Sequence, residues 1–391
     1  MKHWKAYIER QRPEYLHVTI PPETAADIVV VIPCYNEPAL FDTLHNLRAS
    51  DSPKANVLTV IVFNSSVLSN ENAVRQNKIS YEQAVLFADR YNKPGFGFFS
   101  LLFEDLPRKH AGVGLARRIG MDLAVEHFLR NGKPRGVIIS LDADCTVSAN
   151  FFTTIWEAFS HDKSLNTTIH DFRHRLEKDG PVPESAARQY EAYIRYFRTM
   201  LEYTGFPCYY HTVGSAFAVS AEAYVRVGGM GRQQGGEDFY FLQKIFALGN
   251  IRELKDTRVF PMARLSDRVP FGTGPSLQKI KDEPEGNIRA YSEKSFHILK
   301  EFFDMKDVFF GKDPQSAEAM TKALHPSLQQ FLKEIDFPGL VRDCNENSAS
   351  PATFRKRFFH HFNAFRIIKY LNRVHPDPFP YESFASLVDK Y

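Results

Sequence analysis

The residues with the clearest chemical potential are two aspartates, Asp142 and Asp144, which follow the apolar run 137–141. A short apolar run of this kind predicts a buried strand, and the two carboxylates would then lie at its carboxyl end. Carboxylate oxygens suit Mg²⁺ or Mn²⁺, and such an ion could bridge the two phosphates of a nucleotide. A solvated turn after a strand is the alternative, but two acids directly after a buried run favour a metal site.

A second acidic pair, Glu237 and Asp238, follows two glycines and precedes the apolar run 239–246. Glycines permit a tight turn into a helix, and acidic residues stabilise the first turn of a helix. The pair could therefore be ordinary helix-start acids. Alternatively, Asp238 could be a general base that takes the proton of an acceptor hydroxyl, an effect of ~10²–10⁴-fold in rate.

Two segments combine arginine with glycine. Gly114 leads into an expected helix whose free N–H groups would face an anion, and Arg117 could contact a diphosphate there. Arg264 and Arg268 lie in a stretch rich in glycine and charge that could close over phosphates as a lid. The alternatives are a helix start with two solvated arginines, Arg117 and Arg118, and a solvated surface loop.

The elements that must position these residues follow from the apolar pattern. Five buried strands are expected, at 28–32, 57–63, 98–103, 137–141 and 216–219. Helical spacing lies between them, which predicts βαβ units and a mostly parallel sheet with helices on both faces. Ligands bind beyond the carboxyl ends of such strands. This edge would gather the residues that follow the strands, namely Pro33, Tyr35, Glu37, Asn64, Asp142 and Asp144.

Other stretches predict a different structure. A helix is expected over 187–203, a long loop over 264–287, and a mainly helical region from about residue 291. The aromatic and basic stretch 354–373 could be an amphipathic helix on an anionic membrane. We favour a helix packed in the core with a solvated basic side, because aromatic helical stripes usually face a core.

The composition narrows the class of protein. The chain has 391 residues and a formal net charge of +3, without the clustered Lys and Arg of a nucleic-acid-binding protein. Its four cysteines show no metal-ligand spacing and predict reduced thiols. The first 20 residues lack a signal-type apolar stretch, so we expect a cytoplasmic protein, with peripheral contact to the inner face of the membrane as an option.

In order over roughly residues 25–270, these motifs resemble the family 2 glycosyltransferases, whose nucleotide-binding domain is of the GT-A type. The segment from Pro33 through Tyr35 to Glu37 resembles the opening strand and nucleotide-contacting turn of that family. Asn64 stands near its second nucleotide contact, where the family usually has an aspartate. The helix that begins near Arg117 resembles the one facing the donor. Further matches are Asp142-Ala143-Asp144 with the DxD metal motif and Glu237-Asp238 with the ED pair.

The resemblance implies a GT-A type, Rossmann-like α/β fold with a mostly parallel sheet flanked by helices and a helical C-terminal extension. We expect an N-terminal extension over 1–24, a catalytic domain over 25–290 and a helical region over 291–391. The implied reaction is an inverting transfer from a UDP- or GDP-linked sugar to a glycan, a lipid-linked or a small-molecule acceptor. Asp142 and Asp144 would hold Mn²⁺ or Mg²⁺, and Asp238, with Glu237 beside it, would be the base.

Three other functions stay open at this point. Asp142 to Val147 also fits a haloacid-dehalogenase type of phosphatase motif, in which Asp142 would be the nucleophile. That motif normally opens its domain, whereas here two or three βα units precede it. A nucleotidyltransferase that makes NDP-sugars would usually need a glycine-rich basic loop after the first strand, which is absent here. A non-catalytic binding protein is the third alternative.

Overall fold

The computed structural model describes residues 2–11, 18–21, 24–109, 111–177, 180–265, 272–283 and 288–384. By its internal contacts the chain divides into two compact units. Unit 1 comprises residues 1–182 and 212–276, and unit 2 comprises 183–211 and 277–391. The expected boundaries after residues 24 and 290 stay a prediction.

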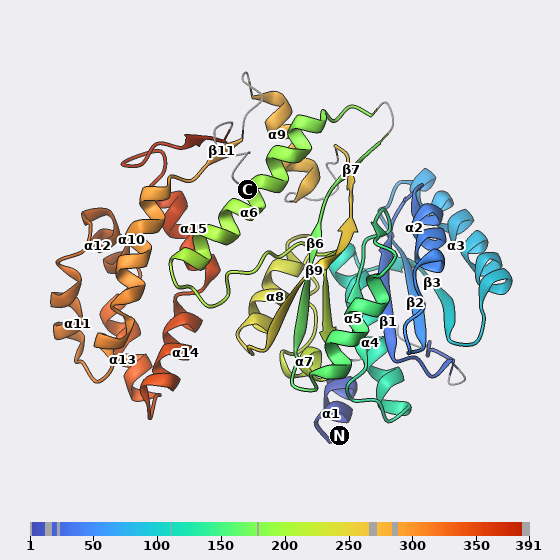
Figure 1. The fold of residues 1–391 in the computed structure, drawn as a ribbon, viewed down its shortest axis with the longest axis horizontal. Coiled ribbons are helices and arrows are strands. Elements are labelled where there is room, and N and C mark those ends of the chain that lie inside the picture. Colours follow the sequence, from blue (N-terminus) through green and yellow to red (C-terminus); the bar gives the residue numbers. More distant parts are fainter. Residues whose placement is uncertain are drawn as a thin grey trace. The chain divides into compact units, whose positions relative to one another are not determined.

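One sheet forms the centre of unit 1 (Figure 1). Among the described residues it has eight strands in the order β3-β2-β1-β4-β8-β6-β9-β5. The pairings from β3 to β4 are parallel, as is that of β6 with β9, and the rest are antiparallel. The strands are β1 (Ile28–Cys34), β2 (Val57–Ser66), β3 (Phe96–Leu106), β4 (Val137–Ser140), β5 (Thr146–Val147), β6 (Thr167–Phe172), β8 (Phe217–Ser220) and β9 (Ile251–Phe260).

The five expected strands are all present, although the one expected at 98–103 is only partly buried. Every residue of β1, β4 and β8 is buried. Pro33 is tolerated inside β1, although it lacks an N–H group, because β4 pairs only with Ile28 to Val31 and ends before it. The prediction of an α/β fold with a mostly parallel sheet flanked by helices and a helical C-terminal region is confirmed.

Helices flank this sheet in unit 1 (Figure 1). They pack on it through apolar residues at helical spacing, such as Leu40, Leu44 and Leu47. They are α1 (Lys2–Gln11), α2 (Leu40–Ala49), α3 (Glu71–Tyr91), α4 (Val113–Arg130), α5 (Phe151–His161), α7 (Ala221–Arg226) and α8 (Glu237–Phe246). Two short strands, β7 (Arg175–Leu176) and β10 (Met262–Ala263), pair in parallel outside the main sheet.

Helix α4 is held by a buried polar network as well as by apolar packing. The hydroxyls of Tyr7 and Tyr224 both donate to Asp122 Oδ1, at 2.8 Å each. Arg118, one turn earlier on α4, pairs with Asp122 Oδ2 at 3.4 Å and donates to the carbonyl of Met230 at 2.9 Å. This network fixes the position of α4 against α1 and α7, and therefore that of Arg117 beside it.

Unit 2 is largely helical. Its elements are α6 (Glu184–Tyr203), β11 (Arg289–Ala290), α10 (Glu293–Asp304), η2 (Lys306–Phe309), α11 (Pro314–Thr321), α12 (Pro326–Glu334), α13 (Phe337–Glu346), α14 (Pro351–His361), α15 (Ala364–Arg373) and β12 (Glu382–Ser383). Helix α9 (Thr273–Asp282) runs across the division between the units. The core of unit 2 is aromatic, with Phe302, Phe358 and Phe362 in mutual ring contact.

The stretch 354–373 forms two helices rather than one. Helix α14 ends at His361, and the Asn363 side chain caps α15 by accepting from the N–H of Arg366. Phe354, Phe358 and Phe362 are fully buried in unit 2, whereas Phe365 is 47% exposed. The packing interpretation therefore accounts for three of the four phenylalanines.

The expected loop over 264–287 is wrong in part, because α9 lies within it. Glycine and proline suggested a loop, but here they occupy the first turn of the helix, where proline costs no hydrogen bond. Leu277 and Ile280, three residues apart, are buried. Strand β9 was also not expected, since its sequence is rich in charge.

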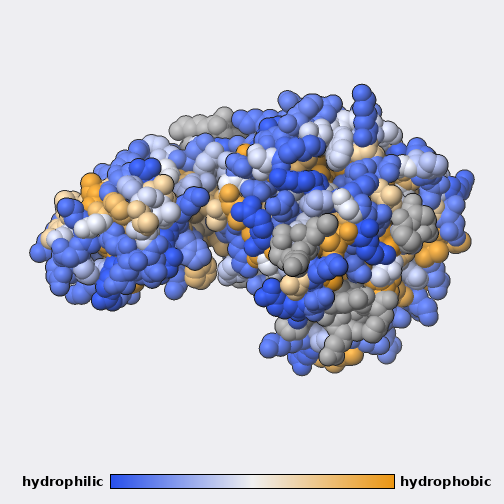
Figure 2. Space-filling model, turned by 90° about the horizontal axis from the view of Figure 1, so that it is seen from below, coloured by the Kyte–Doolittle hydropathy of each residue, from blue (hydrophilic) through white to orange (hydrophobic). Residues whose placement is uncertain are grey.

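Hydrophilic residues predominate on the face seen in Figure 2, and hydrophobic residues are interspersed among them. None of the helices that the structure describes combines the length and the apolar character needed to cross a membrane. The four cysteines are buried and free of disulfide bonds.

Unfolding of the protein should depend on pH through His127. This side chain is fully buried, and its Nε2 atom accepts from the N–H of Ala26 at 3.0 Å. Burial, with Arg130 and Lys133 nearby, lowers its pKa to about 4. Between pH 4 and 6.5 the unfolded chain binds a proton here that the native state does not, so stability is lost as pH falls through this window. The loss should reach about 3 kcal/mol.

His127→Gln, which keeps an acceptor for Ala26, should flatten this pH dependence in urea unfolding measured at pH 4.5 and 7. His161→Gln, at an exposed position at the end of α5, is the control and should leave the slope unchanged. Equal slopes in all three proteins would contradict the assignment to His127.

Candidate functional site

The carboxyl ends of three parallel strands bring most of the predicted residues to one edge of the sheet. Strand β1 lies between β2 and β4, and all three run in parallel. The turn after β1 carries Tyr35 and Glu37, the end of β2 carries Asn64, and Asp142 and Asp144 follow β4. Pro33 is a buried residue of β1 itself, Tyr35 is half-buried, and Glu37 is 5% exposed.

Arg117 of α4 joins the two acidic motifs. Its Nη2 atom donates to Asp142 Oδ1 at 2.5 Å, and its Nη1 atom donates to Glu237. The residue is 2% exposed, so the alternative of a solvated arginine is wrong, as it is for Arg118 at 7%. Burial disfavours its charge, yet Asp142, Glu237 and Asp238 together raise the pKa of Arg117 above its usual value.

A second arginine bridges two further acids of the site. Arg264 follows β10, and its Nη2 atom donates to Asp144 Oδ2 at 2.7 Å and to Glu37. Glu37 also accepts from the N–H of Ala39 at 2.9 Å, which fixes the turn after β1. Arg268, the other expected lid residue, lies outside the described residues.

The acidic pair occupies the first turn of α8, where local geometry decides how Asp238 points. Gly236, just before the helix, has φ +71°, a left-handed conformation that favours glycine. The N–H of Phe239 donates to Asp238 Oδ1 at 2.7 Å. The other oxygen, Oδ2, would lie 2.6 Å from a Cβ at Gly214, so this close approach requires glycine there.

The carboxyl groups of the pair titrate above their ordinary range. Burial raises the pKa of Glu237 to about 7, and the charge of Arg117 offsets this only in part. Burial raises the pKa of Asp238 as well. A carboxylate with a raised pKa is a stronger base, which suits proton removal from a hydroxyl group.

The donor set near β4 fits a hard divalent cation. The side chains of Asp142 and Asp144 are 40% and 20% exposed, so their oxygens are accessible at the end of the strand. Burial and the negative charges of Asp142 and Glu37 raise the pKa of Asp144. Three arginines, Arg117, Arg175 and Arg264, border five acids here, Glu37, Asp142, Asp144, Glu237 and Asp238, and this excess of negative charge favours a cation. Two carboxylates suit an ion whose other ligands are waters and phosphates.

Sequence reasoning missed two residues at this edge. Asn77 of α3 accepts from the N–H of Asn36 at 2.7 Å and donates to the carbonyl of Asn64 at 2.9 Å, which ties the turn after β1 to β2. Arg175 of β7 donates from Nη2 to the carbonyl of Asp144 at 3.1 Å. Neither belongs to a recognisable motif, because each contacts the site from a segment that is distant in the sequence. Asn77 is 41 positions from Asn36, and Arg175 is 31 positions from Asp144.

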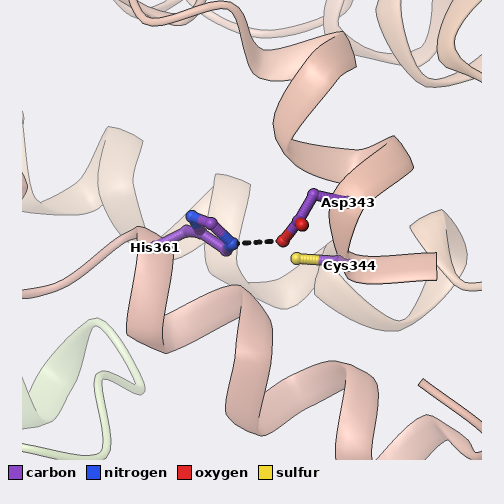
Figure 3. A group of neighbouring side chains, drawn as sticks. All are labelled: Asp343, Cys344 and His361. Carbon is purple, nitrogen blue, oxygen red and sulfur yellow. Dashed lines mark hydrogen bonds and ion pairs between the residues drawn. The ribbon is translucent and has the colours of Figure 1, made fainter. Parts of the chain in front are cut away.

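A different group with metal-ligating side chains lies in unit 2 (Figure 3). Ligand atoms of Asp343, Cys344 and His361 lie within 4.8 Å of one another, and no other such group of three occurs among the described residues. However, Asp343 Oδ2 already pairs with His361 Nε2 at 2.6 Å and with Arg357 Nε at 3.1 Å. Burial raises the pKa of the Cys344 thiol to about 12. A guanidinium on the shared oxygen and a protonated thiol disfavour a metal, so we interpret this group as a link between α13 and α14.

No protein-family model matches the chain, and no curated protein matches it either. Among solved structures, residues 1–349 of S. aureus TarS in complex with UDP-GlcNAc resemble it at 12% identity, with a TM-score of 0.41. That match covers 86% of this chain and 91% of the other. The mannosyltransferase PcManGT from Pyrobaculum calidifontis, in complex with GDP-Man and Mn²⁺, is 15% identical with a TM-score of 0.36, over 92% of this chain and 80% of that one.

Proposed function

We propose that this protein is a metal-dependent glycosyltransferase that moves a sugar from a nucleoside diphosphate to a hydroxyl group of an acceptor. The observation that carries the proposal is the position of Arg117 between Asp142 and Glu237. One buried guanidinium thereby joins Asp142, one of the two proposed cation ligands, to the acidic pair that contains the proposed base. A donor anchored on the first would place its sugar near the second.

In this mechanism Asp142 and Asp144 would hold Mn²⁺ or Mg²⁺. A bound cation would supply stabilisation of the negative charge on the departing diphosphate, an effect of roughly several kcal/mol. The turn with Pro33 and Tyr35, together with Asn64 at the end of β2, is proposed to hold the nucleotide.

Asp238 removes the proton of the acceptor hydroxyl while that oxygen forms a bond to the anomeric carbon. The bond from this carbon to the phosphate oxygen breaks, and its electron pair leaves with the nucleoside diphosphate. Attack from the side opposite the diphosphate inverts the anomeric centre. Glu237 faces Arg117 and keeps the first turn of α8 in place for this step.

Donor binding can be tested by thermal unfolding with UDP-GlcNAc, UDP-glucose and GDP-mannose, each with and without Mn²⁺. A donor at 100 times its Kd should stabilise the protein by about 2.7 kcal/mol, or roughly 5 °C in Tm, and only with the metal present. No shift with uridine or guanosine donors would argue against the proposal. Hydrolysis of p-nitrophenyl phosphate with Mg²⁺ and no nucleotide would instead support the phosphatase.

A further inference from the structure

A third arginine borders the cation-binding acids, in a position that the expected motifs do not include. Arg175 lies on β7, which pairs with β10. In this pairing Arg175 is opposite Met262, which lies two residues before Arg264. Its Nη2 atom donates to the backbone carbonyl of Asp144. The guanidinium of Arg175 is therefore attached to the same residue whose side chain is placed to hold the cation.

The bonding of Arg175 differs from that of the other two arginines. Arg117 and Arg264 each contact two carboxylates. Among the described residues, Arg175 has no carboxylate partner, and its Nε atom is buried without any hydrogen-bond acceptor. A carbonyl does not neutralise a guanidinium, and a buried donor without an acceptor is costly. The charge of Arg175 thus has no direct carboxylate contact, although it lies beside the acids of the proposed cation site.

The chemistry of this charge selects an anionic ligand with several oxygens. A guanidinium offers a planar fork of donors that matches phosphate oxygens, whereas a neutral acceptor hydroxyl needs no such charge. Arg117 and Arg264 cannot turn fully to a phosphate without leaving buried acids unpaired. Arg175 can turn to a phosphate without leaving an acid unpaired. The residue is half-buried, and its hydrogen bond to the carbonyl of Asp144 uses only one of its nitrogens.

We infer that Arg175 binds the diphosphate of the donor. The inference rests on the proposed function, because it requires a nucleoside diphosphate at Asp142 and Asp144. It assigns different tasks to the arginines: Arg117 and Arg264 organise the carboxylates, and Arg175 contacts the substrate.

The test compares Arg175→Gln, Arg175→Lys and Arg173→Gln by isothermal titration calorimetry. Arg173 is an exposed residue two positions earlier, so it controls for the loss of one positive charge in the same segment. The ligands are UDP and GDP with Mn²⁺, the matching nucleosides uridine and guanosine, and Mn²⁺ alone. We expect Arg175→Gln to weaken diphosphate binding about tenfold or more, with Arg175→Lys between it and the wild type. Binding of nucleoside and of Mn²⁺ alone should not change.

The outcomes distinguish the proposed function of the protein from the proposed role of Arg175. If the wild-type protein binds neither diphosphate with Mn²⁺, the proposed function fails and this inference fails with it. If the wild type binds a diphosphate and Arg175→Gln binds it equally well, only the inference about Arg175 is overturned. A loss of affinity for Mn²⁺ alone would also overturn it, since Arg175 would then merely hold Asp144 in place. Should Arg175→Gln fail to fold, Arg175→Lys gives the same comparison with the charge retained.

Discussion

Asp238→Asn should lower the rate of sugar transfer by about 10²- to 10⁴-fold while donor binding is retained. The amide keeps an acceptor for the N–H of Phe239, which Asp238 Oδ1 contacts at 2.7 Å, but it cannot take a proton. Because burial raises the pKa of Asp238, the wild-type rate should rise with pH over its acidic limb, and the variant should lack that limb. Transfer is measured as release of the nucleoside diphosphate in the presence of acceptor.

Glu222→Gln is the matched control for this variant. Glu222 lies in the first turn of α7, as Asp238 does in the first turn of α8, but its side chain is 39% exposed and pairs with Arg135. Its replacement should leave the rate unchanged. Normal turnover by Asp238→Asn would remove Asp238 as the base, and a loss of donor-dependent stabilisation in that variant would indicate a structural role instead.

Asp144→Ala should abolish the metal-dependent part of donor binding and lower the rate of transfer by about 10³-fold or more. The estimate follows from the several kcal/mol that a bound cation contributes to stabilising a leaving group. Arg264 retains Glu37 as a partner in this variant, so the fold should be preserved. The measurement is the rise in Tm with UDP- or GDP-linked sugar, with and without Mn²⁺.

Asp171→Ala provides the comparison for Asp144→Ala. Asp171 is 23% exposed and pairs with Arg258, much as Asp144 is 20% exposed and pairs with Arg264. Both variants therefore remove one partly buried acid from an arginine, but Asp171 is not part of the proposed cation site. An unchanged Mn²⁺-dependent shift in Asp144→Ala would exclude Asp144 as a ligand.

The parts of the fold that the sequence could predict are those encoded by local pattern. Runs such as 28–32 and 137–141 are buried on both faces, so their apolar character alone indicated strands of a parallel sheet. The rule that ligands gather at the carboxyl ends of parallel strands then placed Asp142 and Glu37 at the same edge. This placement requires only that the strands are parallel and adjacent in the sheet, which the βαβ pattern predicts.

The contacts that escaped prediction join distant segments. Arg264 and Asp144 were both expected at the site, but their ion pair across 120 positions of the chain was not, and Arg175 comes near both because β7 and β10 pair. Strand β9 is rich in charge because only some of its side chains are buried, so no apolar run marks it. Helix α9 begins with residues that usually indicate loops, and its burial becomes evident only in the folded chain.

The ion pair between Arg264 and Asp144 has a consequence for the order in which the cation and the nucleotide would bind. A guanidinium and a divalent ion compete for the same carboxylate, so Mn²⁺ by itself meets a site whose charge is already partly neutralised. Phosphate oxygens that arrive with the ion would serve as further ligands, so that the ion could replace Arg264 at Asp144 while Arg264 keeps Glu37 as its partner. Mn²⁺ alone should accordingly bind measurably but more weakly than it does together with the nucleotide.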